Sequence, residues 1–308
     1  DVKKKIKEVI DLRINTEINE KKFPFLILAG GKGVFVCHNE QDLSEARKRL
    51  EILFAAGEKQ IVVEEEIIGR EFSYFSLVNH KYHTPLGCAV DYKRLKEGDS
   101  GPNTGGMGAY SPVPWLPENW ESEMKEKIMD PLLSQLIADG IPYCGFLYCG
   151  LMLTKNGIKV IEFNVRLGDP EAQVILTNDS RDLVELCVAA LEKKEGYSPY
   201  VSIPSKTVGV VLTSPDYPYP KKEGLLQEGG LGKKIFKNDS RPFVFATSLH
   251  KGNEVFYPQK GRVMTVVGKD PDYFKKAKEQ VVSKIKEIEI FWKKAYYRKD
   301  IASKVIEE

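Results

Sequence analysis

Apolar side chains recur along the chain in two patterns, and each pattern predicts one kind of element. Apolar residues spaced three or four positions apart give a helix one apolar face. This spacing predicts helices over 2–14, 40–56, 118–139, 180–194 and 271–288. Short apolar runs between polar or glycine-rich turns predict strands. These runs cover 23–27, 33–37, 61–63, 72–78, 84–90, 144–153, 158–163, 206–213, 243–249 and 262–267.

Proline marks irregular points in two of these helices. Pro131 stands inside the helix at 118–139 and predicts a kink, because proline removes one helical hydrogen bond. Asp270-Pro271 is a favourable cap and first-turn pair, so the helix at 271–288 is expected to begin there.

Two further segments have no regular apolar period. Residues 93–117 are rich in glycine and proline, and a stretch of this length is more often functional than a simple turn. Residues 195–205 contain Pro199 and Pro204 and are typical of a linker. We therefore expect residues 206–308 to form a separate lobe.

Composition excludes several classes of protein. The 308 residues are 42% hydrophobic and 29% charged, which is typical of a globular chain. Lys and Arg number 46 against 44 Asp and Glu, and the net charge of +2 gives no general attraction to nucleic acid or to an anionic membrane. No apolar run approaches the length of a transmembrane helix. The five cysteines include no CxxC pair and stand in apolar runs, so we expect reduced thiols and a cytoplasmic location.

A glycine-rich loop between the first two predicted strands is the first candidate for chemistry. It reads Gly30-Gly31-Lys32-Gly33. Glycines let backbone N–H groups approach a phosphate closely, and Lys32 adds a positive charge. The loop is not a Walker A motif, because a strand follows the lysine instead of a helix. We expect it to cover phosphates; a plain flexible hairpin is the alternative.

The second candidate is the end of the strand predicted at 158–163. Alternation along a strand places Glu162, Asn164 and Arg166 on one face. A carboxylate and an amide oxygen two residues apart can share a hard cation such as Mg²⁺. Arg166 could hold an anionic group of a substrate. A solvated polar face is the alternative interpretation.

The third candidate lies within the irregular stretch 93–117 and just before it. Asp91 precedes the basic pair Lys93-Arg94, which suits a phosphate group. A glycine-rich loop follows, and such a loop can wrap a small ligand with backbone donors. Its candidate ligand contacts are Asn103, Thr104, Gly105, Gly106, Met107 and Gly108. A disordered linker is the alternative.

The fourth candidate is a hinge after the strand predicted at 61–63. Backbone groups around Glu64, Glu65 and Ile67 could contact the edge of an adenine. Glu71, which follows the hinge, could accept hydrogen bonds from ribose hydroxyls. By itself the segment is more typical of a solvated acidic turn.

Taken together and in this order, these segments resemble the ATP-grasp superfamily, and within it the glycinamide ribonucleotide synthetase family. The resemblance extends from about Phe23 to Ala302. Its most specific segments are Gly101–Pro112, Gly145–Tyr148 with Gly150–Met152, Glu162–Glu171, Asp182–Cys187, Gly261–Val263 and Arg298–Ile301.

The resemblance implies an α/β protein of the α+β kind, with an ATP-grasp fold of two α+β subdomains and a small C-terminal α+β lobe. The implied boundaries are 1–22 for the remnant of an N-terminal region, 23–71 for the small subdomain, 72–200 for the large subdomain and 206–308 for the lobe.

The resemblance also implies a reaction. ATP, glycine and 5-phosphoribosylamine would give glycinamide ribonucleotide, ADP and phosphate through glycyl phosphate, a step of purine biosynthesis. The implied cofactor is Mg²⁺ or Mn²⁺, and neither nucleic acid nor a membrane is an implied partner.

The resemblance assigns roles to single residues as well. Glu162 and Asn164 match the metal ligands of the family. Lys32 with its glycines matches the phosphate-covering loop, and Glu71 matches the ribose-binding acid. The glycine-rich loop before Pro112, together with Arg166 and Asp169, matches the lining of the acceptor pocket; Lys32, Arg166 and Asp169 are the implied catalytic residues.

Two departures from the family pattern are visible. The family begins with a parallel α/β domain that this sequence lacks. At Ile27-Leu28 the sequence is also short by a few residues, which in the family include a lysine that contacts ATP. We therefore expect the natural protein to be longer at its N-terminus. Two alternatives stay open: another ATP-grasp ligase or carboxylase, which should lack the motif Gly101–Gly108, and a non-catalytic nucleotide-binding homologue.

Overall fold

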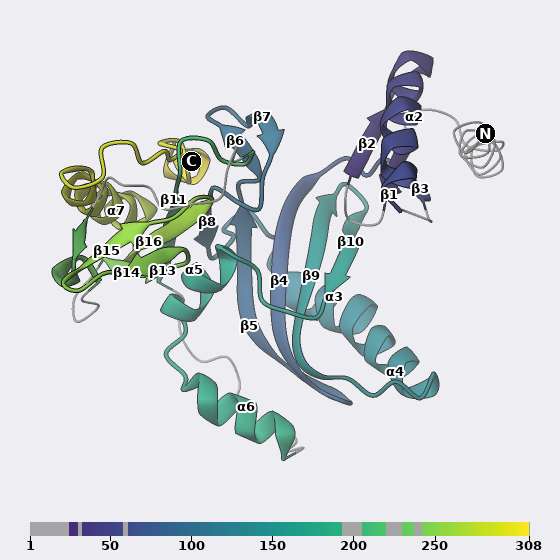
Figure 1. Cartoon of the computed structure of the whole chain (residues 1–308). Coiled ribbons are helices and arrows are strands. Elements are labelled where there is room, and N and C mark those ends of the chain that lie inside the picture. The colour runs from purple at the N-terminus through teal and green to yellow at the C-terminus, as the bar shows by residue number, and fades with distance from the viewer. Residues whose placement is uncertain are drawn as a thin grey trace. The chain divides into compact units, whose positions relative to one another are not determined.

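The computed structural model describes residues 25–29, 33–57, 61–192, 205–219, 230–236 and 242–307. The helix predicted at 2–14, nearly all of the linker 195–205 and the residues Gly30, Gly31 and Lys32 lie outside this described part. The chain forms two compact units, Asp1–Ile68 and Gly69–Glu308, which are described separately (Figure 1).

The first unit contains a three-stranded antiparallel sheet and one helix. The strands are β1 (Phe25–Ala29), β2 (Gly33–Cys37) and β3 (Val62–Glu65), with β1 in the middle. The helix α2 (Glu40–Ala55) packs its apolar face on the sheet. The side chain of Asn39 caps it by accepting hydrogen bonds from the first free backbone N–H groups. The helix predicted at 40–56 and the strands predicted at 33–37 and 61–63 are confirmed, as is the described part of the strand predicted at 23–27.

The second unit is built on an eight-stranded sheet in which all neighbouring strands are antiparallel. Its order is β10-β9-β4-β5-β8-β11-β16-β13. The strands are β4 (Arg70–Asn79), β5 (Tyr82–Asp91), β8 (Gly108–Ser111), β9 (Cys144–Thr154), β10 (Gly157–Asn164), β11 (Lys206–Thr213), β13 (Phe243–Ala246) and β16 (Arg262–Asp270). The sheet therefore continues across both halves of the unit without a break.

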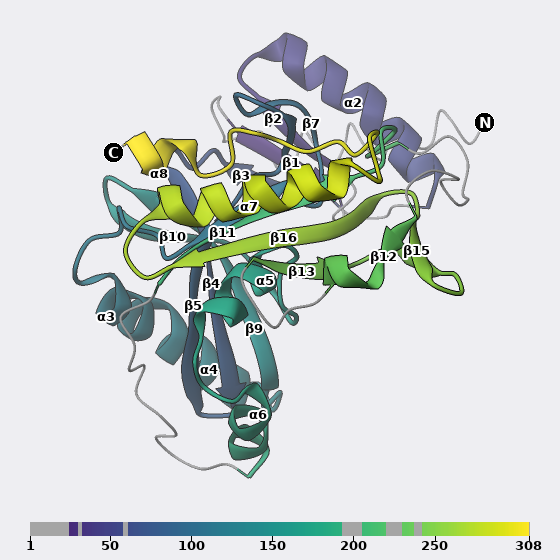
Figure 2. The same cartoon turned by 90° about the vertical axis from the view of Figure 1, so that its left-hand side faces the viewer.

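Helices cover different parts of this sheet. On one face of β4 and β9 lie α3 (Trp120–Met124), a π-helical turn (Lys125–Met129) and α4 (Asp130–Ala138), which bury Met124, Ile128, Met129 and Leu133. The opposite face is partly covered by α5 (Glu171–Asn178) and α6 (Leu183–Leu191). The long helix α7 (Phe274–Glu289) runs along β16 and β11 (Figure 2). Its buried side chains follow the helical period, which explains this attachment.

Smaller elements complete the unit. The hairpin of β6 (Arg94–Lys96) and β7 (Ser100–Asn103) lies in the stretch expected to be irregular, so that prediction is wrong there. A small sheet contains β12 (Leu231–Gly232), β14 (Leu249–Lys251) and β15 (Val255–Pro258). A 3₁₀ turn spans Lys233–Phe236, and α8 spans Ser303–Glu307. No helix in the described part of the chain is both long and apolar enough to span a membrane.

Three helix predictions need correction. Helix α5 was not predicted, because proline, glycine and acidic residues precede it and it has only two turns. The irregularity expected at Pro131 is the π-helical turn that immediately precedes α4. Helix α7 begins at Phe274, because the Asp270 carboxylate accepts from the backbone N–H groups of Asp272 and Tyr273 and so holds a turn in front of the helix.

The residues expected to form a lobe at 206–308 share their main sheet with the strands that precede them. Strand β11 pairs with β8 from Thr207↔Ser111 to Val210↔Gly108, and β8 pairs with β5 on its other edge. The compact unit therefore extends from Gly69 to the end of the chain. Sequence periodicity identified the strands but could not show which strands pair across a long separation.

Gly268 tests how closely α7 packs on the sheet. A Cβ atom at Gly268 of β16 would lie 1.9 Å from the backbone carbonyl oxygen of Ala277 in α7. We expect Gly268→Ala to lower the free energy of unfolding by about 1–3 kcal/mol, because the helix must move away from the sheet. Urea unfolding followed by circular dichroism measures this change. Gly232→Ala is the matched control, since its Cβ meets nothing within 4 Å; equal stability of the two variants would contradict the packing.

Candidate active site

A β-bulge in β10 gives the predicted metal pair its orientation. Val160 lies opposite Leu151 and Glu162 lies opposite Gly150, so Ile161 is an extra residue in the strand. Val160 packs toward the α3–α4 core, and the bulge turns Glu162 to the other face. Asn164 follows on the same face, and its Nδ2 atom donates to Glu162 Oε1 at 2.9 Å. The two side chains are therefore adjacent, as predicted.

Arg166 does not share this strand face. Strand β10 ends at Asn164, so alternation no longer determines the direction of the arginine side chain. The guanidinium of Arg166 donates to the carbonyl of its neighbour Leu167 at 3.1 Å, and the residue is exposed. The prediction that these three residues lie on one strand face is wrong for Arg166.

The register of the sheet extends the polar face beyond β10. Ser73 in β4 lies opposite Gly150 on one side and Ala89 in β5 on the other. Side chains alternate along a strand, so residues two positions apart share a face. Glu71 is two residues before Ser73 and Asp91 is two residues after Ala89, so both lie on the same face as Ser73. The face thus carries acidic side chains from the neighbouring strands β4 and β5 and from β10, which is distant from them in sequence. We call it the polar sheet face.

Glu71 and Lys93 form an ion pair at the edge of the polar sheet face. Both side chains are half-exposed. Burial by itself would lower the pKa of Lys93, but the Glu71 carboxylate raises it above its ordinary value, with further contributions from Tyr148 and Asp91. The residue predicted for the ribose and the residue predicted for a phosphate are therefore in direct contact.

Two carboxylates lie near Lys93: Asp91, which is half-buried but has a buried Oδ1 atom, and Glu171. Glu171, in the first turn of α5, is only 4% exposed. Burial, followed by the charge of Glu171, raises the pKa of Asp91 well above its ordinary value. Burial also raises the pKa of Glu171. Because two neighbouring carboxylates in a dry site resist being charged together, the pair favours a proton or a cation between them.

The surroundings of these carboxylates are polar but incomplete. Ser73 Oγ lies 3.0 Å from the Tyr148 hydroxyl and 3.5 Å from Glu171 Oε1. Asp91 Oδ1 is buried and accepts no hydrogen bond from the described residues. A buried acceptor without a donor is costly, so this atom favours a donor group supplied by a ligand.

The predicted glycine-rich loop closes over Asp91. The backbone N–H and hydroxyl of Thr104 both donate to the Lys93 carbonyl, at 2.7 and 2.8 Å, and Gly106 N donates to Thr104 Oγ1 at 3.1 Å. Gly106 has a φ of +115°, and a Cβ there would lie 2.8 Å from Asp91 Oδ1. Glycine is needed at this position for both reasons.

Arg262 is a further residue of the site. It belongs to one of the segments that carry the family resemblance, but no role could be assigned to it from the sequence. It stands at the start of β16 and donates to the carbonyl of Gly105 at 2.6 Å and to the carbonyl of Asp169. Its guanidinium also lies 3.1 Å from Asp169 Oδ2. Tyr217, which was not predicted, accepts a hydrogen bond from Gly105 N at 2.9 Å. Only the fold brings these two residues to the loop, so spacing in the sequence offered no signal.

The other predicted residues are in three different environments. Met107 is fully buried, and a Cβ at Gly108 would lie 2.6 Å from the Gly209 carbonyl, so the predicted ligand contacts at these two positions are wrong. They belong to the core because β8 is an inner strand of the sheet. Arg94 and Asn103 are exposed partners in the β6–β7 hairpin, where Arg94 donates to the Gly101 carbonyl at 2.9 Å. The predicted nucleotide contacts Gly33, Glu64, Glu65 and Ile67 belong to the first unit.

The protein has the fold of the ATP-grasp enzymes. The biotin carboxylase domain of Hydrogenobacter thermophilus 2-oxoglutarate carboxylase, solved with MgADP and bicarbonate, shares this fold with a TM-score of 0.60 at 18% identity. That similarity covers 92% of this chain and 59% of that chain, and at this identity it supports the fold alone.

The chain belongs to the phosphoribosylglycinamide synthetase family. Residues 11–172 match the ATP-grasp (A) domain of that family, and residues 207–304 match its C domain. A phosphoribosylamine–glycine ligase from Thermotoga maritima is similar in structure, with a TM-score of 0.78 and 28% identity over 96% of this chain and 72% of that chain.

Two curated relatives show how much of a whole protein the chain represents. It is 35% identical to the phosphoribosylamine–glycine ligase of Xanthomonas axonopodis, over 94% of this chain and 67% of that protein. It is 38% identical to the trifunctional purine biosynthetic protein adenosine-3 of Gallus gallus, again over 94% of this chain but only 29% of that protein. The chain thus spans about two thirds of the bacterial ligase and less than a third of the avian protein.

Asp91 is expected to weaken the fold at neutral pH. Its native pKa is raised above the ordinary 3.8, so its stabilising contribution is present below that pH and is lost as pH rises through the native pKa. Asn carries no charge at any pH, and we expect Asp91→Asn to raise stability at pH 7 by about 1 kcal/mol, or roughly 2–4 °C in Tm. The gain should shrink toward pH 4.

Thermal unfolding between pH 4 and pH 8 measures this difference. The control is Asp272→Asn, a substitution at an exposed aspartate, which we expect to leave Tm unchanged. A Tm for the Asp91 variant that is lower than wild type at pH 7 would contradict the destabilising charge.

Proposed function

We propose that the protein joins glycine to 5-phosphoribosylamine at the expense of ATP, giving glycinamide ribonucleotide, ADP and phosphate. The observation that carries this proposal is the polar sheet face with its surroundings: a Glu–Asn pair and Asp91 lie on the face, and Lys93 and the buried Glu171 lie near it within the same unit. Membership of the family and similarity to proteins named phosphoribosylamine–glycine ligase support the same reaction.

The reaction consists of two displacements. A carboxylate oxygen of glycine attacks the γ-phosphorus of ATP, the bond from that phosphorus to the bridging oxygen breaks, and ADP leaves. The amine nitrogen of phosphoribosylamine then attacks the carbonyl carbon of glycyl phosphate. The bond from that carbon to the phosphate oxygen breaks, phosphate leaves, and the nitrogen loses a proton. In both steps negatively charged carboxylate or phosphate groups lie close together. The protein therefore contributes mainly by positioning the substrates and by neutralising this charge.

Glu162 and Asn164 fit a divalent cation. Mg²⁺ prefers oxygen ligands and keeps several of its positions for water and phosphate. The pair supplies one carboxylate and one amide oxygen side by side, and no group of three His, Cys, Asp or Glu residues gathers elsewhere in the described ranges. Mg²⁺, or Mn²⁺, held there would neutralise phosphate charge during transfer.

The nucleotide is assigned to the Gly30–Gly33 loop, the hinge at Glu64–Ile67 and Glu71. The described strands support the loop, because β1 and β2 pair as far as Ala29↔Gly33 and so leave a short connection between antiparallel strands. In this assignment Lys32 neutralises phosphate charge, and Glu71 accepts from the ribose. The ion pair with Lys93 holds the Glu71 carboxylate in one place.

Glycine is assigned to the space beside Asp91 and Glu171. Its ammonium group supplies the cation and the hydrogen-bond donors that these two carboxylates favour. Cβ atoms at Gly106 and Gly168 would lie 2.8 and 2.5 Å from oxygens of Asp91 and Glu171, so the surroundings are tightly filled. The amine of phosphoribosylamine reacts as its uncharged free base, so it does not need a carboxylate partner.

The anionic groups of the substrates are assigned to the cations around the loop. Lys93 and the exposed Arg166 would bind phosphate or carboxylate oxygens, and Arg94, exposed in the β6–β7 hairpin, is a further cation for them. Asp169 acts through others, because Gln173 and Arg262 already bind its carboxylate. We place the reaction in the cytoplasm, with small molecules as its partners; the five free thiols fit a reducing compartment.

Removal of the metal carboxylate should abolish most of the activity. We expect Glu162→Gln in the full-length protein to lower kcat by about 100-fold or more, because phosphate charge is left unneutralised. The side chain is exposed, so the variant should stay folded. The assay is Mg²⁺-dependent ADP release in the presence of glycine and phosphoribosylamine.

The matched control is Glu126→Gln, an exposed glutamate in the π-helical turn on the opposite side of the sheet. Near-wild-type turnover in the Glu162 variant would overturn the metal assignment. ADP release that needs no glycine would instead favour a nucleotide-binding homologue without ligase activity.

The tight surroundings of the two carboxylates also predict substrate selectivity. We expect kcat/KM for L-alanine to be about 10–200-fold lower than for glycine, because one added methyl group must displace filled space. Rates of ADP release with each amino acid, at saturating ATP and phosphoribosylamine, measure the ratio. Comparable values for both would place the amino acid elsewhere.

A further inference from the structure

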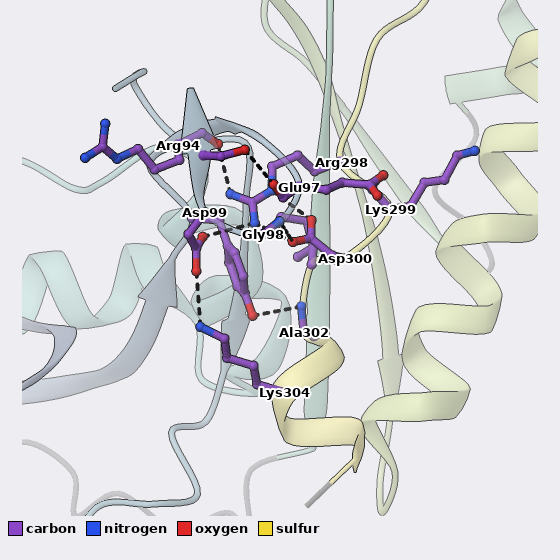
Figure 3. Close-up of polar contacts among 12 residues, drawn as sticks. Arg94, Glu97, Gly98, Asp99, Arg298, Lys299, Asp300, Ala302 and Lys304 are labelled. Carbon is purple, nitrogen blue, oxygen red and sulfur yellow. Dashed lines mark hydrogen bonds and ion pairs between the residues drawn. The ribbon is translucent and has the colours of Figure 1, made fainter. Parts of the chain in front are cut away.

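Arg298 is a buried cation outside the site assigned above. Its side chain is fully buried, and Figure 3 shows its guanidinium between two acidic residues. Nε donates to Asp300 Oδ1 at 2.8 Å, and the second terminal nitrogen donates to Asp300 Oδ2 at 2.6 Å and to Asp99 Oδ1 at 3.0 Å. The fork of Asp300 on Arg298 is therefore bidentate, which fixes the plane of the guanidinium.

Arg298 also contacts Tyr92 and Arg94, the residues immediately before and after Lys93 in the sequence. Its first terminal nitrogen donates to the Arg94 carbonyl at 2.9 Å, and its Cζ atom lies 5.0 Å from the centre of the Tyr92 ring. Arg298 thus contacts the residues on both sides of Lys93, the ring of one and the backbone of the other. The Lys93 carbonyl in turn accepts the two hydrogen bonds from Thr104 that shape the glycine-rich loop.

Neighbouring residues reinforce the same connection between the C-terminal segment 296–304 and the β6–β7 hairpin. Gly98 N donates to Asp300 Oδ2 at 2.9 Å, and Lys299 N donates to Glu97 Oε1 at 3.2 Å (Figure 3). Ala302 N donates to the Tyr92 hydroxyl at 3.1 Å. These contacts join residues about two hundred positions apart in sequence.

Stability alone does not explain a charged residue here. A buried ion pair is often no more stabilising than well-packed apolar side chains of similar volume, because its charges must first leave water. An apolar side chain at 298 could fill the space, but it could not hold the Arg94 carbonyl or fix a direction with a fork. Because these contacts lie on either side of Lys93, they are suited to fixing the position of that residue.

We propose that Arg298 is a positioning residue for the ligation reaction. It acts through Lys93 and the Thr104–Gly106 loop, and so sets where the Lys93 ammonium meets the anionic groups of the substrates. This inference rests on the proposed function, because it assigns Lys93 to that reaction. It also gives the C domain a part in catalytic geometry without any contact to substrate.

The experiment compares single and double variants of the full-length protein in an assay of glycinamide ribonucleotide formation. We expect Arg298→Met and Lys93→Met each to lower kcat by about 10–100-fold, within the range for a misplaced catalytic group. The double variant should lose no more than about twofold beyond the Lys93 variant, because the two residues act as one unit. Arg298→Lys should recover part of the loss, since it retains the charge but not the fork.

Lys304→Ala is the control for a general effect on the C-terminal segment. Lys304 pairs with the same Asp99, at 3.1 Å, but its side chain is exposed, so we expect kcat to be unchanged. Losses that multiply in the Arg298/Lys93 double variant would overturn the positioning role and indicate a purely structural one. Unchanged kcat in a folded Arg298→Met protein would overturn it as well.

A second substitution keeps the test decisive if Arg298→Met does not fold. Asp300→Asn removes one charge but preserves the shape of the fork partner, and we expect a smaller kcat loss that again fails to multiply with Lys93→Met. Multiplying losses in this pair overturn the inference. A wild-type protein that forms no glycinamide ribonucleotide would overturn the proposed function itself, whereas the outcomes above concern Arg298 alone.

Discussion

The backbone pairing of one short strand holds the site together. Strand β8 joins β5 on one edge through Asp91↔Ala109 and joins β11 on the other through Val210↔Gly108. Without this strand the sheet would divide into two, and Arg262 at the start of β16 would not lie beside the loop before β8. Gly108 permits the pairing to be close, because any Cβ there would meet the Gly209 carbonyl. Glycines that look like ligand contacts in the sequence are therefore partly requirements of the sheet.

The second constraint is electrostatic. Asp91 and Glu171 are largely withdrawn from water, Lys93 lies half-exposed near them, and only part of the charge of the two carboxylates is compensated within the described residues. A fold optimised for stability alone would replace such groups, because burying charge costs free energy. Their retention agrees with a site that is completed by a charged substrate. The ion pairs that surround it, Glu71 with Lys93 and Asp169 with Arg262, fix these groups in advance of binding.

The sequence predicted the positions of the helices and strands better than it predicted which segments contact one another. The apolar periods placed α2, β9, β11 and β16 nearly as observed, and the alternation from Ile161 onward placed Glu162 beside Asn164. The alternation did not extend to Arg166, because the strand ends first. Arg262, Tyr217 and Arg298 join the site or its support through pairings across long separations, which no local pattern contains. The hairpin β6–β7 was likewise missed, because contacts with the C-terminal segment hold it instead of a local apolar period.

The most direct test of ligation through an acyl phosphate follows the oxygen atoms. Glycine labelled with ¹⁸O in its carboxylate is supplied to the full-length protein with ATP, Mg²⁺ and phosphoribosylamine, and the released phosphate is analysed by mass spectrometry. The carboxylate oxygen that attacks the γ-phosphorus stays with that phosphorus when the amine displaces it. We expect one labelled oxygen in each phosphate formed. Product that forms with unlabelled phosphate, or ADP that forms without any glycine consumed, would contradict the account.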